Sequence, residues 1–334
     1  MNHGLPLVTL YLTERCNSRC VTCDYWRHGR RDVTLDSVQR LLPELAALGT
    51  RTALVSGGEP LLNPAWADIA GALRGAGLEL WLLTSGLSLA KHARRAAPLF
   101  ESVTVSLDGT CAETYAAIRG LDAFDKVCEG IRTATAAGAT VGLRVTLQRA
   151  NYRELPRFVT LAHELGVSQV SFLAVDVSNP HAFARVDDFT HGLALAPTDL
   201  EEFGRLIARL ESEHAADFRS RFIAESPARL ARLRDYFAAL CGLGAFPPVR
   251  CNAPEFSAVV GVDGHVSPCF FIPGPAAARG LSLSAALDGA PMIELRRAIR
   301  AGERAECERC VCSMYREPAE LASLRLPRRA HAGL

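Results

Sequence analysis

Three cysteines near the start of the chain stand in the pattern Cys-x3-Cys-x2-Cys, directly after an apolar run: Cys16, Cys20 and Cys23. Three thiolates on one short loop can bind three irons of a [4Fe–4S] cluster, because Cys is the usual ligand of such clusters. The fourth iron is then open to a small molecule that carries an amine and a carboxylate. A zinc site would normally need a fourth protein ligand, for which His28 is the nearest candidate. The spacing therefore predicts an iron–sulfur cluster with one open iron.

A second group of cysteines lies between residues 251 and 312. Four of them can form a four-thiolate site: Cys251, Cys269, Cys307 and Cys310. A structural zinc ribbon also uses four cysteines, so composition alone leaves zinc and a cluster open. The fifth, Cys312, could be a substitute ligand, a hydrogen-atom donor or an inert thiol. The isolated cysteines are expected to be small apolar fillers: Cys111, Cys128 and Cys241.

Eleven cysteines in 334 residues are more than packing needs in a reducing compartment, where disulfides are rare. Their clustering therefore indicates metal binding. The formal net charge is +1, which argues against a nucleic-acid partner. The sequence shows neither a signal peptide nor a run of about 18 apolar residues. We therefore expect a cytoplasmic location and no membrane contact.

Short apolar runs alternate with longer amphipathic stretches up to about residue 177. The predicted strands are Leu7–Thr13, Thr52–Ser56, Glu79–Thr84, Ser102–Ser106, Thr140–Leu147 and Gln169–Val175. The predicted helices are Leu35–Leu48, Ala65–Gly75, Ser88–Phe100, Phe124–Ala137 and Arg153–Leu165. Six β–α repeats predict an α/β fold in which a parallel sheet curls into a partial (β/α)6 barrel. In such folds the chemistry gathers at the C-terminal ends of the strands.

The remaining chain has a different pattern. We expect residues 1–177 to form the barrel and residues 178–250 to form a helical bridge, with helices over Thr198–His214 and Pro227–Leu240. Residues 251–334 are expected to form a small module of a β-hairpin and a helix. Asp263-Gly264 is a strong two-residue hairpin signal, and Ser284–Ala301 is predicted to be one helix.

The cysteine loop and the strand ends that follow it resemble the radical S-adenosylmethionine (radical SAM) superfamily over roughly residues 7–177. The segment 57–60 is similar to the GGEP motif of that family, and the turn at 84–86 is similar to its T-N-G turn. The resemblance implies that these residues contact S-adenosylmethionine: Gly57, Gly58, Glu59, Pro60, Thr84, Ser106, Asp108 and Arg144. Thr22 stands where the family commonly has an aromatic residue against adenine, and Tyr25 or Trp26 is expected to replace it.

The C-terminal cysteines resemble the SPASM module of this superfamily, or its shortened "twitch" form. Full SPASM modules carry seven cysteines, whereas five are present here. The resemblance therefore implies one auxiliary [4Fe–4S] cluster in addition to the cluster that binds S-adenosylmethionine. The layout is similar to that of single-cluster aminocyclitol dehydrogenases, such as the one in the butirosin pathway. It implies oxidation of a sugar or aminocyclitol alcohol to a ketone, with a flavodoxin- or ferredoxin-type reductant.

Two other reactions stay open. In an epimerase, a cysteine thiol would return hydrogen to the opposite face of the substrate radical, with Cys312 as the first candidate donor and Cys241 as the second. In a peptide maturase, the substrate would be a ribosomal peptide. Asp176, His181 and His191 lie at or just after the end of the sixth predicted strand, and they are candidates for substrate contacts or a catalytic base.

Overall fold

Eight strands form one continuous sheet in the structure, a computed structural model that describes residues 4–27, 29–180, 182–185, 192–317 and 319–321. The strands are β1 (Leu7–Tyr11), β2 (Thr52–Ser56), β3 (Glu79–Thr84), β4 (Ser102–Ser106), β5 (Val141–Leu147), β6 (Gln169–Ala174), β7 (Ser257–Val260) and β8 (Val266–Ser267). Their order in the sheet is β6-β5-β4-β3-β2-β1-β7-β8. β1 to β6 pair in parallel with their sequence neighbours, so the predicted α/β partial barrel is confirmed.

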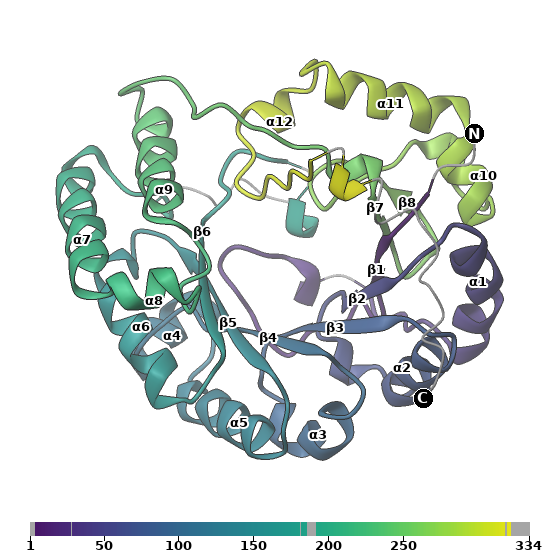
Figure 1. The fold of residues 1–334 in the computed structure, drawn as a ribbon, viewed down its shortest axis with the longest axis horizontal. Coiled ribbons are helices and arrows are strands. Elements are labelled where there is room, and N and C mark those ends of the chain that lie inside the picture. Colours follow the sequence, from purple (N-terminus) through teal and green to yellow (C-terminus); the bar gives the residue numbers. More distant parts are fainter. Residues whose placement is uncertain (1–3, 28, 181, 186–191, 318, 322–334) are drawn as a thin grey trace.

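Helices cover the outer face of the sheet, while the strands curve around the middle of the molecule (Figure 1). The helices are α1 (Leu35–Ala47), α2 (Trp66–Gly75), α3 (Leu89–Ala96), α4 (Ala112–Arg119), α5 (Phe124–Ala136), α6 (Leu155–Glu164), α7 (Leu200–Glu213), α8 (Ala215–Arg219), α9 (Pro227–Leu240), α10 (Leu283–Asp288), α11 (Ala290–Arg300) and α12 (Ala305–Glu308). Hydroxyl caps start three of them: Thr34 accepts from the backbone of Ser37 at α1, Ser226 from that of Arg229 at α9, and Ser282 from that of Ala285 at α10. No helix in the described ranges is long and apolar enough to cross a lipid bilayer.

The two faces of the barrel sheet differ in burial. Along β5 every second residue from Val141 to Leu147 is buried, and Arg144 and Thr146 between them are only partly buried. The buried set packs with outer-helix residues such as Phe158 into one core. Because successive side chains of a strand point to opposite faces, Arg144 and Thr146 point to the inner side of the barrel. Polar residues on this face are available to a ligand.

The hairpin predicted around Asp263-Gly264 is present, but its position was not predicted. β7 and β8 pair antiparallel, and Gly264 takes the left-handed conformation with φ +76°. β7 also pairs in parallel with β1, with Leu7 opposite Ser257, so the hairpin extends the barrel sheet. Pairing between strands so distant in the chain leaves no local sequence signal. The division of the chain at residues 177 and 250 stays a prediction.

Three helix predictions need correction. The single helix predicted over 284–301 is two, α10 and α11, because Gly289 adopts an extended conformation with ψ 141° and Pro291 lies at the start of α11. The helix predicted to reach Phe100 ends at Ala96, since Pro98 has no backbone N–H with which to continue the helical hydrogen bonds. Helix α4 was missed; it ends at Gly120, whose φ of +73° is the left-handed conformation that terminates many helices.

Candidate functional site

The first cysteine loop follows β1 and is hydrogen-bonded to the end of α4. Arg19 N–H donates to the carbonyl of Arg119 at 3.0 Å, and Val21 N–H donates to that of Ile118 at 3.0 Å. Gly120 permits this approach, because a Cβ at that position would lie 2.2 Å from the carbonyl oxygen of Arg19. The helix that sequence patterns missed therefore shapes the loop that carries the cysteines.

The side chains of Cys16, Cys20 and Cys23 are partly buried and close enough to influence one another. Burial raises the pKa of the Cys16 thiol to about 11 and that of Cys23 to about 12, and charge on Cys20 contributes to both. The Arg119 guanidinium acts in the opposite direction on all three thiols. Three mutually close thiols beside a positive charge fit a [4Fe–4S] cluster bound through three thiolates.

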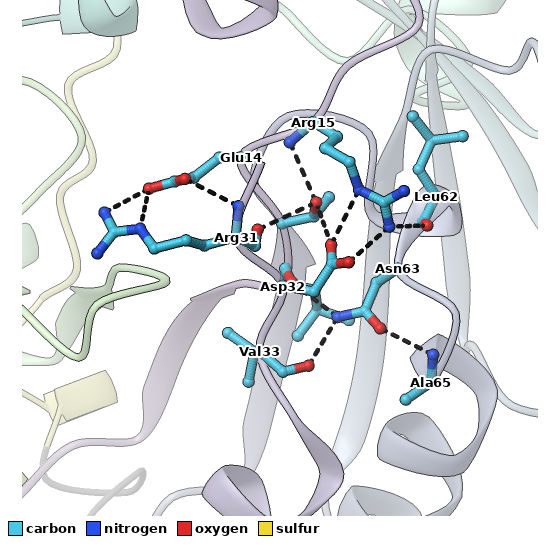
Figure 2. A network of polar contacts seen from close by, with 10 residues as sticks. Glu14, Arg15, Arg31, Asp32, Val33, Leu62, Asn63 and Ala65 are labelled. Carbon is cyan, nitrogen blue, oxygen red and sulfur yellow. Dashed lines mark hydrogen bonds and ion pairs between the residues drawn. The ribbon is translucent and has the colours of Figure 1, made fainter. Parts of the chain in front are cut away.

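A polar network joins this loop to the segment after β2 (Figure 2). The Arg15 guanidinium donates to the Asp32 carboxylate at 2.6 Å and to the Leu62 carbonyl at 2.5 Å. The Asn63 amide donates to the Leu12 carbonyl at 2.7 Å. Arg15 directly precedes the first cysteine, and Leu62 and Asn63 follow the GGEP-like segment closely. The network therefore fixes these two motifs relative to each other.

The glycines of the GGEP-like segment let its backbone lie against the cysteine loop. Gly58 N–H donates to the Thr13 carbonyl at 2.8 Å, and Glu59 N–H donates to the Arg15 carbonyl at 2.7 Å. Gly57 has a φ of +128°, and a Cβ on Gly58 would lie 2.2 Å from the Arg15 carbonyl oxygen. These glycines therefore admit the neighbouring backbone, and their contact with S-adenosylmethionine stays a prediction.

We predict that Gly58→Ala destabilises the protein by about 1–3 kcal/mol, because the new methyl group meets backbone that cannot move aside cheaply. Chemical denaturation of the iron-free protein measures this free energy of unfolding. Gly71→Ala is the matched control: Gly71 lies in α2 with nothing within 4 Å of an added Cβ. That change should stabilise the helix by about 0.5–1 kcal/mol. Equal effects of the two substitutions would contradict the prediction.

Glu59 ties the second strand end to the third. Its carboxylate is fully buried and accepts from Thr84 Oγ1 at 2.9 Å, from Ser85 N–H at 2.7 Å and from Ser85 Oγ at 2.7 Å. Leu61 N–H, one residue beyond Pro60, donates at 3.2 Å. Burial raises the pKa of Glu59, and these donors oppose the shift. The carboxylate therefore positions the loop, and the contact of Glu59 with methionine stays a prediction.

Asp108 is engaged with the chain itself. It is buried, and its carboxylate accepts from Arg119 Nη1 at 3.1 Å and from Thr146 N–H at 2.7 Å. Burial raises the pKa of Asp108, and Arg119 opposes the shift. Burial alone would lower the pKa of Arg119, but Cys20 and Asp108 outweigh it and the net direction is upward. Asp108 thus holds a guanidinium beside the cysteine loop, and its predicted ribose contact stays a prediction.

Ser106 and Arg144 are direct neighbours on β4 and β5. Arg144 Nε is buried and has no hydrogen-bond partner among the described residues. Its charge opposes the burial that raises the pKa of Glu225 and of Cys312. Arg144 therefore lies between Ser106, a predicted S-adenosylmethionine contact, and the C-terminal cysteines.

The second cysteine group also comes together. Burial raises the pKa of Cys269 to about 11, and Cys251 and Cys307 contribute. Burial likewise raises the pKa of Cys310, with contributions from Cys312, Cys251 and Cys269, and Cys310 Sγ accepts from the backbone N–H of Cys312 at 3.4 Å. In the described part of the chain, no three His, Cys, Asp or Glu side chains are close enough to hold a single metal ion. A four-iron cluster does not need its protein ligands around one metal ion, because each thiolate binds a different iron.

The loop after β6 is held to both cysteine segments. Asp176 accepts from the backbone N–H of Ser178 and of Asn179, each at 2.9 Å, and forms an ion pair with Arg185 at 3.5 Å. Arg185 also donates to the Thr22 carbonyl at 3.3 Å, inside the first cysteine loop. The contacts of Asp176 are those of a loop organiser, and its catalytic role stays a prediction. His181 and His191 lie outside the described residues.

The two candidates for the adenine contact differ in their surroundings. Tyr25, in a short 3-10 helix (Tyr25–Arg27), lies edge-on to Tyr11 with ring centroids 5.9 Å apart. The Arg27 guanidinium lies over the Trp26 ring, 4.8 Å from its centroid. One face of Trp26 is therefore already covered, whereas Tyr25 contacts an aromatic neighbour at its edge.

Known proteins match the barrel and, in some cases, most of the chain. The sequence profile described as the radical SAM superfamily matches residues 10–162. GTP 3',8-cyclase of Pseudomonas fluorescens is 30% identical over 259 residues, which cover 72% of this chain and 75% of that protein. This chain belongs to the radical SAM superfamily. Enzymes of this superfamily use S-adenosylmethionine and a [4Fe–4S] cluster, which the loop with Cys16, Cys20 and Cys23 suits.

Further similarities of this radical SAM chain are narrower. The AdoMet-dependent heme synthase of Methanosarcina barkeri is 32% identical over 173 residues, which cover 50% of this chain and 49% of that protein. The chain therefore spans about half the length of that relative. The crystal structure of Streptococcus suis SuiB bound to S-adenosylmethionine has a TM-score of 0.64 at 13% identity, and the match covers 94% of this chain and 73% of SuiB. At that identity the likeness concerns the fold alone.

Sequence reasoning missed two residues that position the site, Arg119 and Arg185. Each is buried and donates to a carboxylate, Asp108 and Asp176 respectively. Neither stands in a recognisable spacing relative to a cysteine. There was no direct signal for either residue in the sequence. Segment 112–119 was not predicted to be a helix, so nothing indicated that the Arg at its end would be buried.

Proposed function

We propose that this radical SAM enzyme oxidises an alcohol of a sugar- or aminocyclitol-like substrate to a ketone, with a second [4Fe–4S] cluster as the electron acceptor. One observation carries the proposal: Cys251, Cys269, Cys307 and Cys310 come together although they are spread over 60 residues of sequence. Four thiolates leave no iron of a cube open to substrate, which favours a redox role over a substrate-binding role. The residue types thus support two clusters with different tasks.

In this proposal the chain's own residues hold the two motif loops together and orient S-adenosylmethionine. When bound, the first cluster and S-adenosylmethionine supply a 5'-deoxyadenosyl radical that can abstract hydrogen from an unactivated carbon. Arg15 and Asn63 hold the cysteine loop against the GGEP-like loop, so that both face the same end of the barrel. Ser106 and Arg144 present hydrogen-bonding groups on the inner face, where they are predicted to contact S-adenosylmethionine.

We predict that Cys269→Ala, in enzyme with both sites reconstituted with iron and sulfide, still forms 5'-deoxyadenosine but no oxidised product. Bound iron should fall from about eight to about four per chain, because only the second site is lost. Mass spectrometry of reactions with a panel of sugars and aminocyclitols measures both products. Cys111→Ala is the control, since Cys111 is exposed and isolated. A wild-type product of unchanged mass would rule out the oxidation.

Epimerisation is the second candidate, and the position of Cys312 favours it. The thiol lies within electrostatic reach of Arg144 on β5, so a substrate bound beside Arg144 would have Cys312 nearby. In the same assay, Cys312→Ala separates the two reactions. A dehydrogenase keeps its product, whereas an epimerase loses its product while 5'-deoxyadenosine still forms.

A further inference from the structure

Three aromatic side chains connect the two cysteine groups. Tyr25 follows Cys23 by two residues, and Phe270 directly follows Cys269. Tyr11, the last residue of β1, lies between them: its ring centroid is 5.9 Å from that of Tyr25 at an interplanar angle of 90°, and 6.3 Å from that of Phe270 at 31°. The rings Tyr25, Tyr11 and Phe270 therefore form a continuous series from one cysteine loop to the other.

The surroundings of the Tyr11 hydroxyl agree with this geometry. Burial raises the pKa of Tyr11 well above its ordinary value, and the neighbouring Tyr25 raises it further. Charge on Cys23 and on Cys269 adds to the same shift. One side chain thus lies within electrostatic reach of a cysteine from each group.

The strand pairing explains why Tyr11 occupies this place. β1 lies between β2 and β7 in the sheet, with Leu10 opposite Val260. Because β1 leads into the first cysteine loop and β7 leads through the hairpin to Cys269, the end of β1 lies where the two segments meet. An aromatic residue here fills the space between them with packed ring atoms.

We propose that the series Tyr25–Tyr11–Phe270 is the route by which one electron passes between the two iron–sulfur sites, and this rests on the proposed function because it requires a cluster at each site. The substrate radical of the proposed oxidation supplies the electron. With a cluster bound at each site, one electron would leave the reduced cluster held by the second cysteine group and enter the oxidised cluster held by the first. No bond forms or breaks, no proton moves, and the rings keep their oxidation state. Electron tunnelling falls off across unfilled gaps, so rings in contact favour it.

The test uses the full chain with both clusters reconstituted and without substrate. Photoreduction with a deazaflavin delivers less than one electron per chain, and freeze-quench electron paramagnetic resonance follows its redistribution between the clusters. We expect Tyr11→Leu to lose the fast redistribution, whereas Tyr11→Phe keeps it because the ring is retained. Phe203→Leu is the matched control, since Phe203 is a fully buried ring in α7 that packs against Tyr152.

Redistribution at the wild-type rate in an iron-replete Tyr11→Leu protein would overturn the route and leave the proposed function intact. If Tyr11→Leu binds less iron, the test is repeated with Phe270→Leu, which keeps Tyr11 and Tyr25 in place. Loss of the fast redistribution would again support the route, and redistribution at the wild-type rate would again overturn it. A wild-type protein that binds only about four irons would instead contradict the two-cluster function, and the route with it.

Discussion

Replacing Cys16, Cys20 and Cys23 together by alanine is expected to abolish S-adenosylmethionine cleavage and to remove about four of about eight bound irons. The three thiols lie on one loop and influence one another, so the triple substitution removes all three predicted ligands of the first cluster together. Anaerobic reconstitution, iron and sulfide counts, and 5'-deoxyadenosine formation with dithionite measure the effect.

Controls separate loss of the cluster from loss of the fold. Cys111→Ala changes an exposed thiol that lies 3.5 Å from Thr114 Oγ1, and it should retain iron and cleavage. Circular dichroism of the triple variant should match that of the wild type, because the loop is also held by backbone bonds to α4. Cleavage that persists in the triple variant would contradict the assignment of the loop. About four irons in the wild type, with cleavage intact, would remove the second cluster and with it the proposed electron acceptor.

The barrel could be predicted from sequence because its signals are local. Strands β2, β3 and β4 and helix α9 begin and end where the pattern of apolar residues and turns placed them. The cysteine loop and the segment 57–60 could likewise be recognised from the sequence. The spacing of residues on one short loop determines which side chains can bind the same ligand. These features depend on neighbours within a few residues.

The features that could not be predicted depend on contacts between distant segments. The pairing of β7 with β1 places Tyr11 between the two cysteine groups, and nothing near Tyr11 in the sequence indicates it. The donors to the Glu59 carboxylate, Thr84 and Ser85, come from the next strand end and were not predicted. A buried carboxylate must find such donors, but sequence alone does not say which element supplies them.

The partners of Asp108 lead to the second large prediction: Asp108→Ala should destabilise the iron-free protein by about 3–5 kcal/mol, because it leaves the buried Arg119 charge without its carboxylate. Chemical denaturation measures the loss. Asp36→Ala, which removes an exposed ion pair with Arg40 on α1, is the control and should have little effect.

The paired variant Asp108→Ala/Arg119→Met distinguishes a broken ion pair from a damaged fold. Replacing both charges by apolar groups is often neutral, so the double variant should recover much of the stability that Asp108→Ala loses. It should nevertheless bind iron poorly, since it lacks the Arg119 guanidinium, the positive charge beside Cys20. The double variant would then be stable and yet bind little iron, as expected if Asp108 and Arg119 position the cysteine loop. A double variant that unfolds as readily as Asp108→Ala, or an Asp108→Ala protein as stable as Asp36→Ala, would contradict that role.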